Sequence, residues 1–356
     1  MNSPLPHSLK LSILRGGTSR ALFLRLRDLP HSQPRRDELC LRLIGSPDPI
    51  ASDGLGGGVS SNSKVMFVGT PTEAHEAFPD LVLQQETDVV SYFAQVSPTE
   101  NTVDWGGNCG NISSAISAYA LAEGLITFPH SSTSASCRVY NINTHSYLEL
   151  HHPVEQGTFP RHGDFQLDGV PGTAPRVDLR FLAPRQEVIH TAIDGLTTTL
   201  INVTNPIAIF RAHDVGMDID ASPHQLNSDK SLLSTLENLR RTAGKLMGLE
   251  PSAVIPRVAI VEPYSSPSYP EGCLKARMTS LGVVHHAIPG TGLLALAAAR
   301  ALGSPVIDLP PAEHTTVLHP KGKAKVSANV QDGVVSWVAL ARSARLIMSG
   351  TVYLSC

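Results

Sequence analysis

A cysteine at the beginning of a predicted helix is the residue of this chain best suited to chemistry. Cys109 lies in the segment GGNCGN (106–111), directly before a run of small and apolar residues that predicts a helix. A helix start presents unpaired backbone N–H groups and a partial positive charge, and both favour a thiolate over a thiol. Cys109 is therefore a candidate proton-transfer group. The alternative is a small side chain that fills a tight strand-to-helix turn.

A lysine that enters an apolar strand is the second candidate. Lys64 follows the polar run SSNS (60–63) and precedes VMFV (65–68). If the amine is removed from water, its neutral form is favoured and can act as a base. More often such a lysine extends its charge to solvent. The hydroxyl and amide groups of 60–63 could donate hydrogen bonds to a carboxylate, although such a run is equally ordinary as a turn.

A third segment is suited to binding an anion. In RGGTSR (15–20) the glycines permit a nest of backbone N–H groups, and the arginines can hold a carboxylate through paired hydrogen bonds. The chain has no G-x-x-x-x-G-K-[ST] loop, and the glycines of 54–58 lack the following helix and distal acid of a dinucleotide site. The histidine pairs at 151–152 and 285–286 lack metal-ligand spacing. We therefore expect no metal and no cofactor.

Composition limits the classes of function. The 356 residues are 42% hydrophobic and 17% charged, which suits buried cores rather than a disordered chain. A net charge of −3 and the lack of a basic run argue against nucleic acid as a partner. The five cysteines are irregularly spaced without a C-x-x-C pair, so for all but Cys109 we expect a small buried side chain.

With neither a signal peptide nor an apolar run of about 20 residues, the sequence predicts a cytoplasmic protein without a membrane partner. Its apolar composition allows a homodimer.

Strands and two small-residue helices would position the candidate groups. Alternating apolar positions predict a strand, a glycine turn and a second strand over 9–26. One helix is predicted over 112–124, where it ends at Gly124, and another over 290–303, where it opens at a Gly-Thr-Gly turn. The other predicted elements are a short helix at 38–45, an amphipathic helix at 231–249, a strand from Val65, and strands or strand pairs at 89–97, 137–152, 197–210, 256–263, 276–288, 324–330 and 334–355.

The two halves of the chain share this plan. Each contains strands and one helix that is apolar nearly all round, as buried helices are. Glycine and proline become dense over 162–181, so we predict domains at 1–182 and 183–356. If each half wraps a sheet around its helix, the two helix starts would face a common cleft. A thiol, a lysine and several turn donors there would suit proton transfer at a carbon next to carboxylates.

The motifs also resemble those of a known family, the PrpF-type isomerases. That family includes 2-methylaconitate, aconitate, methylitaconate and 4-oxalomesaconate isomerases and shares the fold of diaminopimelate epimerase. The matching segments follow the family's order along nearly the whole chain: RGGTS (15–19), GGG and SSNSKV (56–65), VDWGGNCGNIS (103–113), YN and NT (140–144), DGVPGT (168–173), NP (205–206), HHA and TG (285–292), and AR and ARL (341–346).

The resemblance implies an α/β (α+β) fold of two similar domains, each a sheet rolled around a central helix. It also implies that Lys64 and Cys109 are the acid–base pair, without saying which is the base. The groups expected to hold substrate carboxylates are Ser19, Ser61, Asn62, Asn108, Gly110, Asn111, Gly290 and Thr291. The expected activity is a cofactor-independent shift of a double bond, or of cis–trans geometry, in an unsaturated tricarboxylic acid of the aconitate type.

Two other functions remain open at this point. An amino-acid epimerase or racemase would need a second acid–base residue at 289–292, where relatives that invert a stereocentre have a cysteine and this chain reads PGTG. The third hypothesis is a non-catalytic accessory protein on the same fold. The chain also departs from the family at VTNP (203–206), where Ala-Gly usually precedes Asn-Pro, and at 70–85, which is longer than usual and is expected to form a loop at the cleft rim or between subunits.

Overall fold

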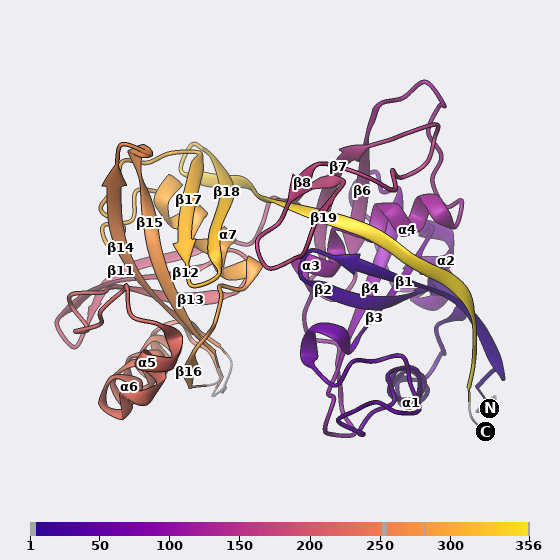
Figure 1. Ribbon diagram of the computed structural model, residues 1–356, viewed down its shortest axis with the longest axis horizontal. Helices are drawn as coiled ribbons and strands as arrows, with labels where there is room; N and C mark the ends of the chain where they lie inside the picture. The colour runs from indigo at the N-terminus through magenta and orange to yellow at the C-terminus, as the bar shows by residue number, and fades with distance from the viewer. Residues whose placement is uncertain (1–4, 251–254, 281, 355–356) are drawn as a thin grey trace. The chain divides into compact units, whose positions relative to one another are not determined.

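The computed structural model describes residues 5–250, 255–280 and 282–354. The chain divides into two compact units (Figure 1): unit 1 comprises Met1–Arg180 and Ala341–Cys356, and unit 2 comprises Phe181–Leu340. The sequence-based boundary after residue 182 lies close to the first division. Residues 341–354, which that boundary assigned to the second domain, instead pack in unit 1 because they pair with its first strand. The last residue of the predicted 334–355 strand, and Cys356, lie outside the described residues.

Unit 1 is a mixed sheet with short helices. Its helices are α1 (Gln33–Ile44), α2 (Pro71–Ala77), α3 (Gly110–Ser113) and α4 (Ile116–Ala122), with 3-10 turns η1 (Leu26–Asp28) and η2 (Ser60–Asn62). Its strands are β1 (Ser8–Gly16), β2 (Ser19–Arg25), β3 (Lys64–Gly69), β4 (Val89–Val96), β5 (Val103–Asp104), β6 (Ser134–Asn141), β7 (Ser146–Pro153), β8 (Phe165–Gln166) and β9 (Thr173–Ala174), together with most of β10 (Arg176–Leu182) and the C-terminal part of β19 (Val334–Tyr353).

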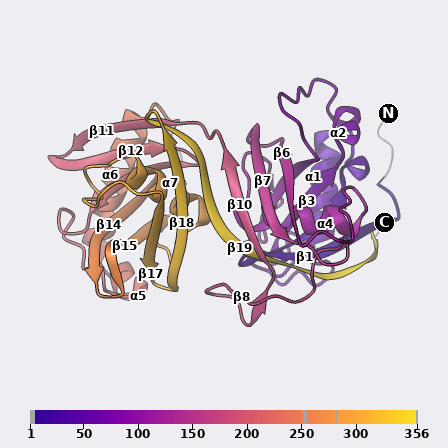
Figure 2. The same cartoon turned by 90° about the horizontal axis from the view of Figure 1, so that it is seen from above.

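Apolar alternation and glycine turns produce the pairing of these strands. β1 and β2 form an antiparallel hairpin, β2 and β3 are parallel, and β3 and β4 are antiparallel. β4 and β6 are again parallel, and β6, β7 and β10 lie side by side (Figure 2). The C-terminal part of β19 pairs antiparallel with β1. Helix α4 is buried along most of its length, and its Tyr119 ring packs 5.3 Å from that of Phe23 on β2.

Unit 2 has the same mixture of elements. Its helices are α5 (Pro223–Ser228), α6 (Lys230–Leu246) and α7 (Gly290–Ala301). Its strands are β11 (Glu187–Ile193), β12 (Leu196–Asn202), β13 (Pro206–Arg211), β14 (Arg257–Ser266), β15 (Tyr269–Ser280), β16 (Val283–Val284), β17 (His314–His319), β18 (Gly322–Gln331) and the beginning of β19. α7 buries nearly every residue from Gly292 to Arg300, as its all-round apolar sequence predicts.

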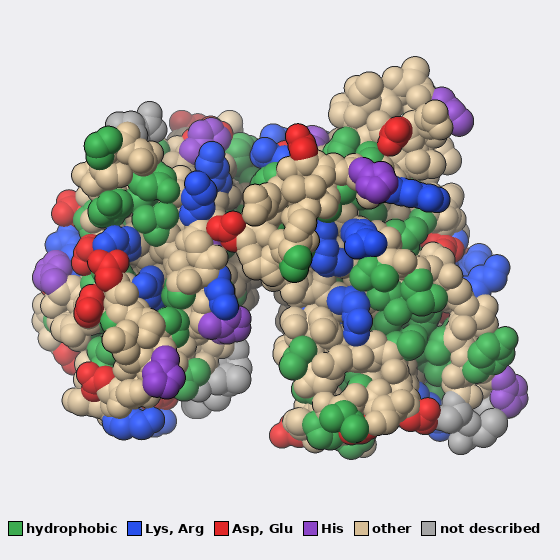
Figure 3. All heavy atoms as spheres, in the orientation of Figure 1, with side chains coloured by type: hydrophobic (Ala, Val, Ile, Leu, Met, Phe, Trp, Pro, Cys, Tyr) green, Lys and Arg blue, Asp and Glu red, His purple; other side chains and the backbone are tan. Residues whose placement is uncertain are grey.

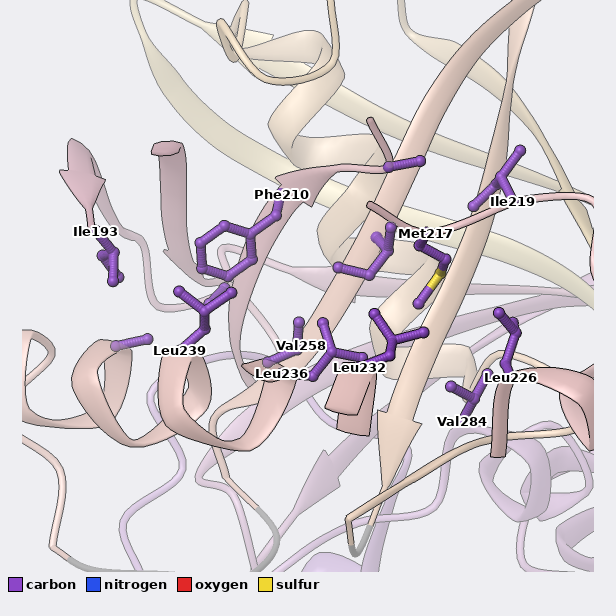
Figure 4. Packing of buried hydrophobic residues seen from close by; sticks show 14 of the residues in the cluster. Ile193, Phe210, Met217, Ile219, Leu226, Leu232, Leu236, Leu239, Val258 and Val284 are labelled. Carbon is purple, nitrogen blue, oxygen red and sulfur yellow. The ribbon is translucent and has the colours of Figure 1, made fainter. Parts of the chain in front are cut away.

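The amphipathic helix α6 covers one face of the unit 2 sheet. Leu232, Leu236 and Leu239 recur at helical spacing and point toward Phe210 on β13 and Val258 on β14 (Figure 4). These side chains are all buried. Each such leucine contributes about 1.5–3 kcal/mol when it is withdrawn from water, so this stripe is a main source of stability for α6.

Several sequence predictions need correction. The predicted helix over 112–124 is broken into α3 and α4 at Ser114 and Ala115, where the Ser114 hydroxyl donates to the carbonyl of Asn111. The strand-like segment 197–210 forms the hairpin of β12 and β13. Part of the predicted 70–85 loop is helix α2, which begins with a capping box between Thr70 and Glu73. No helix among the described residues is long and apolar enough to span a membrane.

Candidate active site

Lys64 stands at the edge of the unit 1 sheet where two parallel strands begin. β2 begins at Ser19 and β3 begins at Lys64, and because these strands are parallel their first residues lie at the same edge. The β1–β2 turn, residues 16–19, therefore lies close to the start of β3. Neighbouring strands are about 4.8 Å apart and each residue advances the chain by about 3.3 Å, so the long lysine side chain can reach the space beside this turn.

The ammonium group of Lys64 is buried and held by a glutamine. Only 6% of Lys64 is exposed, and its Nζ donates to Oε1 of Gln95, the residue opposite it on β4. The amide of Gln95 is oriented because its Nε2 donates to the carbonyls of Ser63 (3.0 Å) and Ser60 (3.2 Å). An amide fixed in this way presents its oxygen to Lys64. The lysine therefore stays inside the unit instead of extending to bulk solvent.

The segment that carries Cys109 is held in place by contacts of both the side chain and the backbone carbonyl of Trp105. The Trp105 ring stacks on Tyr92 with centroids 4.6 Å apart, and its Nε1 donates to Asp37 at 2.7 Å. The side-chain amide of Asn143 donates to the carbonyl of Trp105 at 2.8 Å and to that of Phe93 at 2.8 Å. Because β5 pairs with the end of β4, the chain leaves this edge of the sheet only a few residues before Cys109. Lys64 and Cys109 thus belong to one edge of unit 1.

Cys109 is the N-cap residue of α3 and is partly exposed. Its backbone N–H is 2.7 Å from Oδ1 of Asn108, which also accepts from the Ser113 hydroxyl at 3.0 Å. Asn108 Nδ2, in contrast, is buried and has no hydrogen-bond partner among the described residues. A buried amide donor without an acceptor is costly, so this atom marks a place where a bound carboxylate would be favoured. α3 has one turn only, and it supplies a smaller helix dipole than the long helix that the sequence predicts.

Asn111 joins α3 to the β1–β2 turn and to β19. Its Nδ2 donates to the Thr18 hydroxyl at 3.0 Å, and its Oδ1 accepts from Nε of Arg342 at 2.8 Å. Gly17 has a φ of +52°, and a Cβ there would overlap Oδ1 of Asn111. The Gly-Gly pair at 16–17 therefore permits both the left-handed turn and the close approach of α3. Arg15 adds a further bond to this turn by donating to the carbonyl of Gly17 at 2.9 Å.

Three arginines lie in register across adjacent strands beside this turn. Arg15 on β1 is opposite Arg345 on β19 and opposite Arg20 on β2. Burial lowers the pKa of Arg15 below its usual value, and the charge of Arg345 lowers it further. No salt bridge joins these arginines to a carboxylate in the described part of the chain. Like charges opposite one another are unfavourable, so the row is suited to an anion. Figure 3 shows Lys and Arg side chains, in blue, at several places on the face of unit 1 that it draws.

The remaining unit 1 candidates are close to the same edge. Ser19 is buried at the start of β2, whereas Ser61 is exposed in η2. Asn62 packs against Gly57, whose neighbour Gly56 accepts from Arg20 at 3.2 Å. Eight predicted residues therefore belong to unit 1: Ser19, Ser61, Asn62, Lys64, Asn108, Cys109, Gly110 and Asn111.

The unit 2 candidates stand at the start of α7. The hydroxyl of Thr291 accepts from Nδ2 of Asn205 at 3.2 Å, and its carbonyl accepts from the Thr204 hydroxyl at 2.8 Å. Gly290 is the first residue of the helix. Asn205 of the matching Asn-Pro segment, and Thr204, where the chain departs from the family, thus support the turn that the sequence identified at 290–292. The common cleft remains a prediction from the sequence.

Sequence reasoning gave no role to three groups at the unit 1 site, although two of them stand in the matching segment 341–346. Gln95 holds Lys64, Arg342 holds Asn111, and Arg345 extends the arginine row. The sequence did contain a signal for Arg342 and Arg345. These two arginines interrupt an otherwise apolar strand, VALARSARLIM (338–348), and a charged residue in such a strand indicates a structural or functional role.

The other described cysteines are not candidates for the site. Cys40, Cys137 and Cys273 are buried and free, as the sequence predicted. Burial raises the pKa of Cys137 to about 12, so its thiol is inert at neutral pH. Among the residues that the structure describes, no group of three or more His, Cys, Asp or Glu side chains could hold a metal ion.

Comparison with known proteins identifies relatives along the whole chain. The family model described as PrpF protein matches residues 8–355. A 2-methyl-aconitate isomerase from Shewanella oneidensis is 31% identical over 401 residues, which cover 99% of this chain and 98% of the relative. A 3-methylitaconate isomerase from Eubacterium barkeri is 31% identical over 376 residues, with 96% of each chain covered. A 4-oxalomesaconate tautomerase from Pseudomonas putida is 29% identical over 357 residues and covers 96% of this chain and 94% of its own.

Solved structures give the same result for the fold. The crystal structure of a methylitaconate-delta-isomerase superposes with a TM-score of 0.79 at 31% identity and covers 98% of this chain and 95% of its own. A hydroxyproline epimerase from Agrobacterium vitis superposes with a TM-score of 0.56 at 14% identity, covering 99% of this chain and 95% of its own. At that low identity the second similarity concerns the fold alone, which is a mixed α/β fold of the kind found in such epimerases.

Proposed function

The chain belongs to the PrpF family, and on this premise we propose that it is a cofactor-independent isomerase of an unsaturated tricarboxylic acid of the aconitate type. The three relatives are named for 2-methyl-aconitate, 3-methylitaconate and 4-oxalomesaconate, which are all unsaturated polycarboxylic acids. In the same proposal each unit is a sheet rolled around a central helix, α3–α4 in one and α7 in the other, as in diaminopimelate epimerase.

One observation carries the proposal. The two candidate proton-transfer side chains, Lys64 and Cys109, belong to one edge of unit 1, beside the β1–β2 turn. The buried Nδ2 of Asn108, which has no partner among the described residues, supplies a donor for a substrate carboxylate beside Cys109. Arg15, Arg20 and Arg345 stand next to the same turn, on the face of the sheet opposite Lys64.

The proposed reaction uses the acidity of a carbon next to a double bond. One of the pair Lys64 and Cys109 removes an allylic proton, and the electron pair of the broken C–H bond spreads over the alkene and its carboxylate. The amide and backbone donors beside Cys109 stabilise this dienolate because its negative charge grows where they are held in place. The other group then donates a proton at the far end of the allyl system, or at the same carbon after rotation. The first outcome moves the double bond and the second changes cis–trans geometry.

The sequence PGTG at 289–292 disfavours the epimerase alternative in one respect. Stereoinversion with two acid–base groups on opposite sides needs a second thiol or equivalent near 289–292. Thr291 offers only an alcohol, which accepts a hydrogen bond from Asn205 at 3.2 Å and is a poor proton donor near neutral pH.

The test is ¹H NMR of the purified protein in D₂O without added cofactor. cis-Aconitate, 2-methylaconitate and 4-oxalomesaconate are each offered to the wild type and to the variants Cys109→Ser and Lys64→Ala. We expect isomerisation of an aconitate-type substrate with deuterium incorporation in the wild type, and a loss of at least about 10²-fold in each variant, since general acid–base groups contribute that much. Lys10→Ala, which removes an exposed lysine from β1, is the matched control and should retain full activity.

Two outcomes would reject the proposal. If proline or hydroxyproline racemises while no polycarboxylate reacts, the epimerase reading replaces it. If no substrate reacts but polycarboxylates still bind, as measured by calorimetry, the protein is a non-catalytic member of the family.

A further inference from the structure

Three arginines form a row across the strands β19, β1 and β2. Arg15 on β1 is opposite Arg345 on β19 and opposite Arg20 on β2. Residues opposite one another on paired strands point to the same face of the sheet, and neighbouring strands are about 4.8 Å apart, so the backbone positions of the row span about 10 Å. Three like charges at this spacing repel one another, and the row is therefore unfavourable unless negative groups lie beside it.

This row lies on the other face of the sheet from the candidate active site. A Cβ added to Gly16 would overlap the carbonyl oxygen of Asn111, so α3 packs against the face to which residue 16 points. Side chains alternate between the two faces along a strand, and Arg15 therefore points to the opposite face. The register of β2 and β3 separates the row from Lys64 as well, because Lys64 is level with Ala21 and shares its face.

Two of the three guanidinium groups are held in place by neutral acceptors. Nη1 of Arg15 donates to the carbonyl of Gly17 at 2.9 Å, and to the carbonyl and the hydroxyl of Ser343 at 3.0 Å each. Nη2 of Arg20 donates to the carbonyl of Gly56 at 3.2 Å. These bonds fix both groups and leave further N–H donors without an acceptor in the described part of the chain. Groups that are already fixed lose little conformational entropy when a ligand binds.

The charge of the row is not balanced by the protein. Among the residues that the structure describes, no Asp or Glu forms a salt bridge with any of the three arginines. Burial lowers the pKa of Arg15, and the neighbouring charge of Arg345 lowers it further. Arg345 is exposed, so the row is open to solvent at one end. The row therefore offers positive charge and fixed hydrogen-bond donors to an anion from solution.

The geometry points to a second anion site in unit 1, formed by Arg15, Arg20 and Arg345, that binds a small polyanion with at least two carboxylate or phosphate groups. A row of about 10 Å is longer than one carboxylate, whereas a ligand with two or three negative groups can contact each guanidinium. The planar donor pairs of arginine match the oxygens of both kinds of group. This site is separate from the proposed isomerase site and does not depend on its activity.

Arginine labelling tests where a polyanion binds, with citrate and pyrophosphate as the probes. Phenylglyoxal modifies accessible arginines, and mass spectrometry of the peptides reports each one separately. At ten times its Kd a probe should slow the modification of Arg345 about ten-fold, because the site is then empty for only about a tenth of the time. Arg161, an exposed arginine outside the row, should react at an unchanged rate. Protection by citrate alone or by pyrophosphate alone identifies the ligand as a carboxylate or a phosphate.

Variants measured by calorimetry at low salt test the row itself. Arg345→Gln and Arg20→Gln should each weaken binding of the protecting probe about ten-fold, because each removes charged hydrogen bonds to it. Arg345→Lys should weaken binding less, since it keeps the charge and loses only the paired donors. Arg161→Gln makes the same change of charge outside the row, and as the matched control it should leave the Kd within two-fold of the wild type. Arg15 is left in place because it also holds the β1–β2 turn.

Three results overturn the inference. The first is that neither probe protects Arg345 at about 10 mM, a concentration that would nearly saturate even a site of millimolar affinity. The second is that Arg345→Gln and Arg20→Gln both bind with wild-type affinity while Lys64→Ala does not bind, which would place the probe in the isomerase site. The third is protection of Arg345 by hexaglutamate and by neither small probe, which would assign the row to an acidic protein partner. Because none of these measurements needs turnover, binding at the row in a protein that isomerises nothing rejects the proposed function only.

Discussion

Replacement of Gly17 by alanine should disturb the site through one side chain. Gly17 has a φ of +52°, and an added Cβ would overlap Oδ1 of Asn111 and lie 2.8 Å from its Cγ and 3.0 Å from Cδ of Arg342. Asn111 cannot simply rotate away, because its amide bonds Thr18 and Arg342 at 3.0 and 2.8 Å. The variant should therefore lose stability and also displace the Asn111–Arg342 pair.

The expected cost has two parts. A left-handed backbone costs an L-residue about 1–2 kcal/mol. Overpacking against Asn111 and Arg342 adds about 1–3 kcal/mol. Gly124→Ala isolates the first part, because Gly124 has a φ of +66° with no atom within 4 Å of the added Cβ. We expect Gly17→Ala to reduce the free energy of unfolding by about 2–5 kcal/mol and Gly124→Ala by about 1–2 kcal/mol.

Tryptophan fluorescence measures this loss in unit 1 alone. The chain has two tryptophans, and a Trp337→Phe background leaves Trp105 as the only reporter. Urea unfolding in that background gives the difference between the two alanine variants. If Gly17→Ala costs no more than Gly124→Ala, and iodoacetamide alkylation of Cys109 is unchanged, the close approach of α3 to the β1–β2 turn does not support the site as argued above.

Three other measurements probe particular contacts. Burial lowers the pKa of His152, whose neutral ring is bonded to the Ser117 hydroxyl (2.6 Å) and the carbonyl of Pro153 (2.9 Å). As the pH falls, the unfolded chain therefore binds a proton at a higher pH than the folded chain does. The free energy of unfolding should decrease as pH falls below about 6.5, by at most about 1.4 kcal/mol per pH unit. His152→Asn should flatten this slope in urea titrations. Thr70→Ala removes the capping box of α2 and should cost about 1 kcal/mol by the same assay, with no effect expected from the neighbouring exposed Thr72→Ala. Gln95→Met leaves Lys64 without its acceptor and should lower kcat on the order of ten-fold with little change in KM, whereas a larger change in KM would indicate that Gln95 binds substrate.

Local sequence patterns predicted those parts of the fold that depend on residues close together in the sequence. Gly124 ends α4 with a left-handed φ, and the leucines of α6 cover the sheet as their spacing indicates. The missed α2 also had a local signal, since Thr70 and Glu73 form a capping box around Pro71. The break between α3 and α4 was harder to predict, because adjacent serines at 113–114 are tolerated in many helices and only the contact of Ser114 with Asn111 decides the outcome.

The candidate site divides in the same way. Lys64 and Cys109 were found from their immediate neighbours in the sequence. Gln95, Arg342 and Arg345 act through strand register and through contacts between segments more than 30 residues apart, such as the 2.8 Å bond between Arg342 and Asn111. No local pattern encodes a partner at that separation. Two signals were available for Arg342 and Arg345: charged residues in an otherwise apolar strand, and the matching segment 341–346.

The most direct test of the proton-transfer account compares exchange with isomerisation in D₂O. Lys64→Met and Cys109→Ser each remove one of the two proposed proton-transfer groups. The variant that has lost the base should neither exchange the allylic proton nor form the isomer, whereas the variant that has lost the acid should exchange that proton while forming little or no isomer. If either variant forms the isomer at the wild-type rate, Lys64 and Cys109 are not the acid–base pair and the account is contradicted.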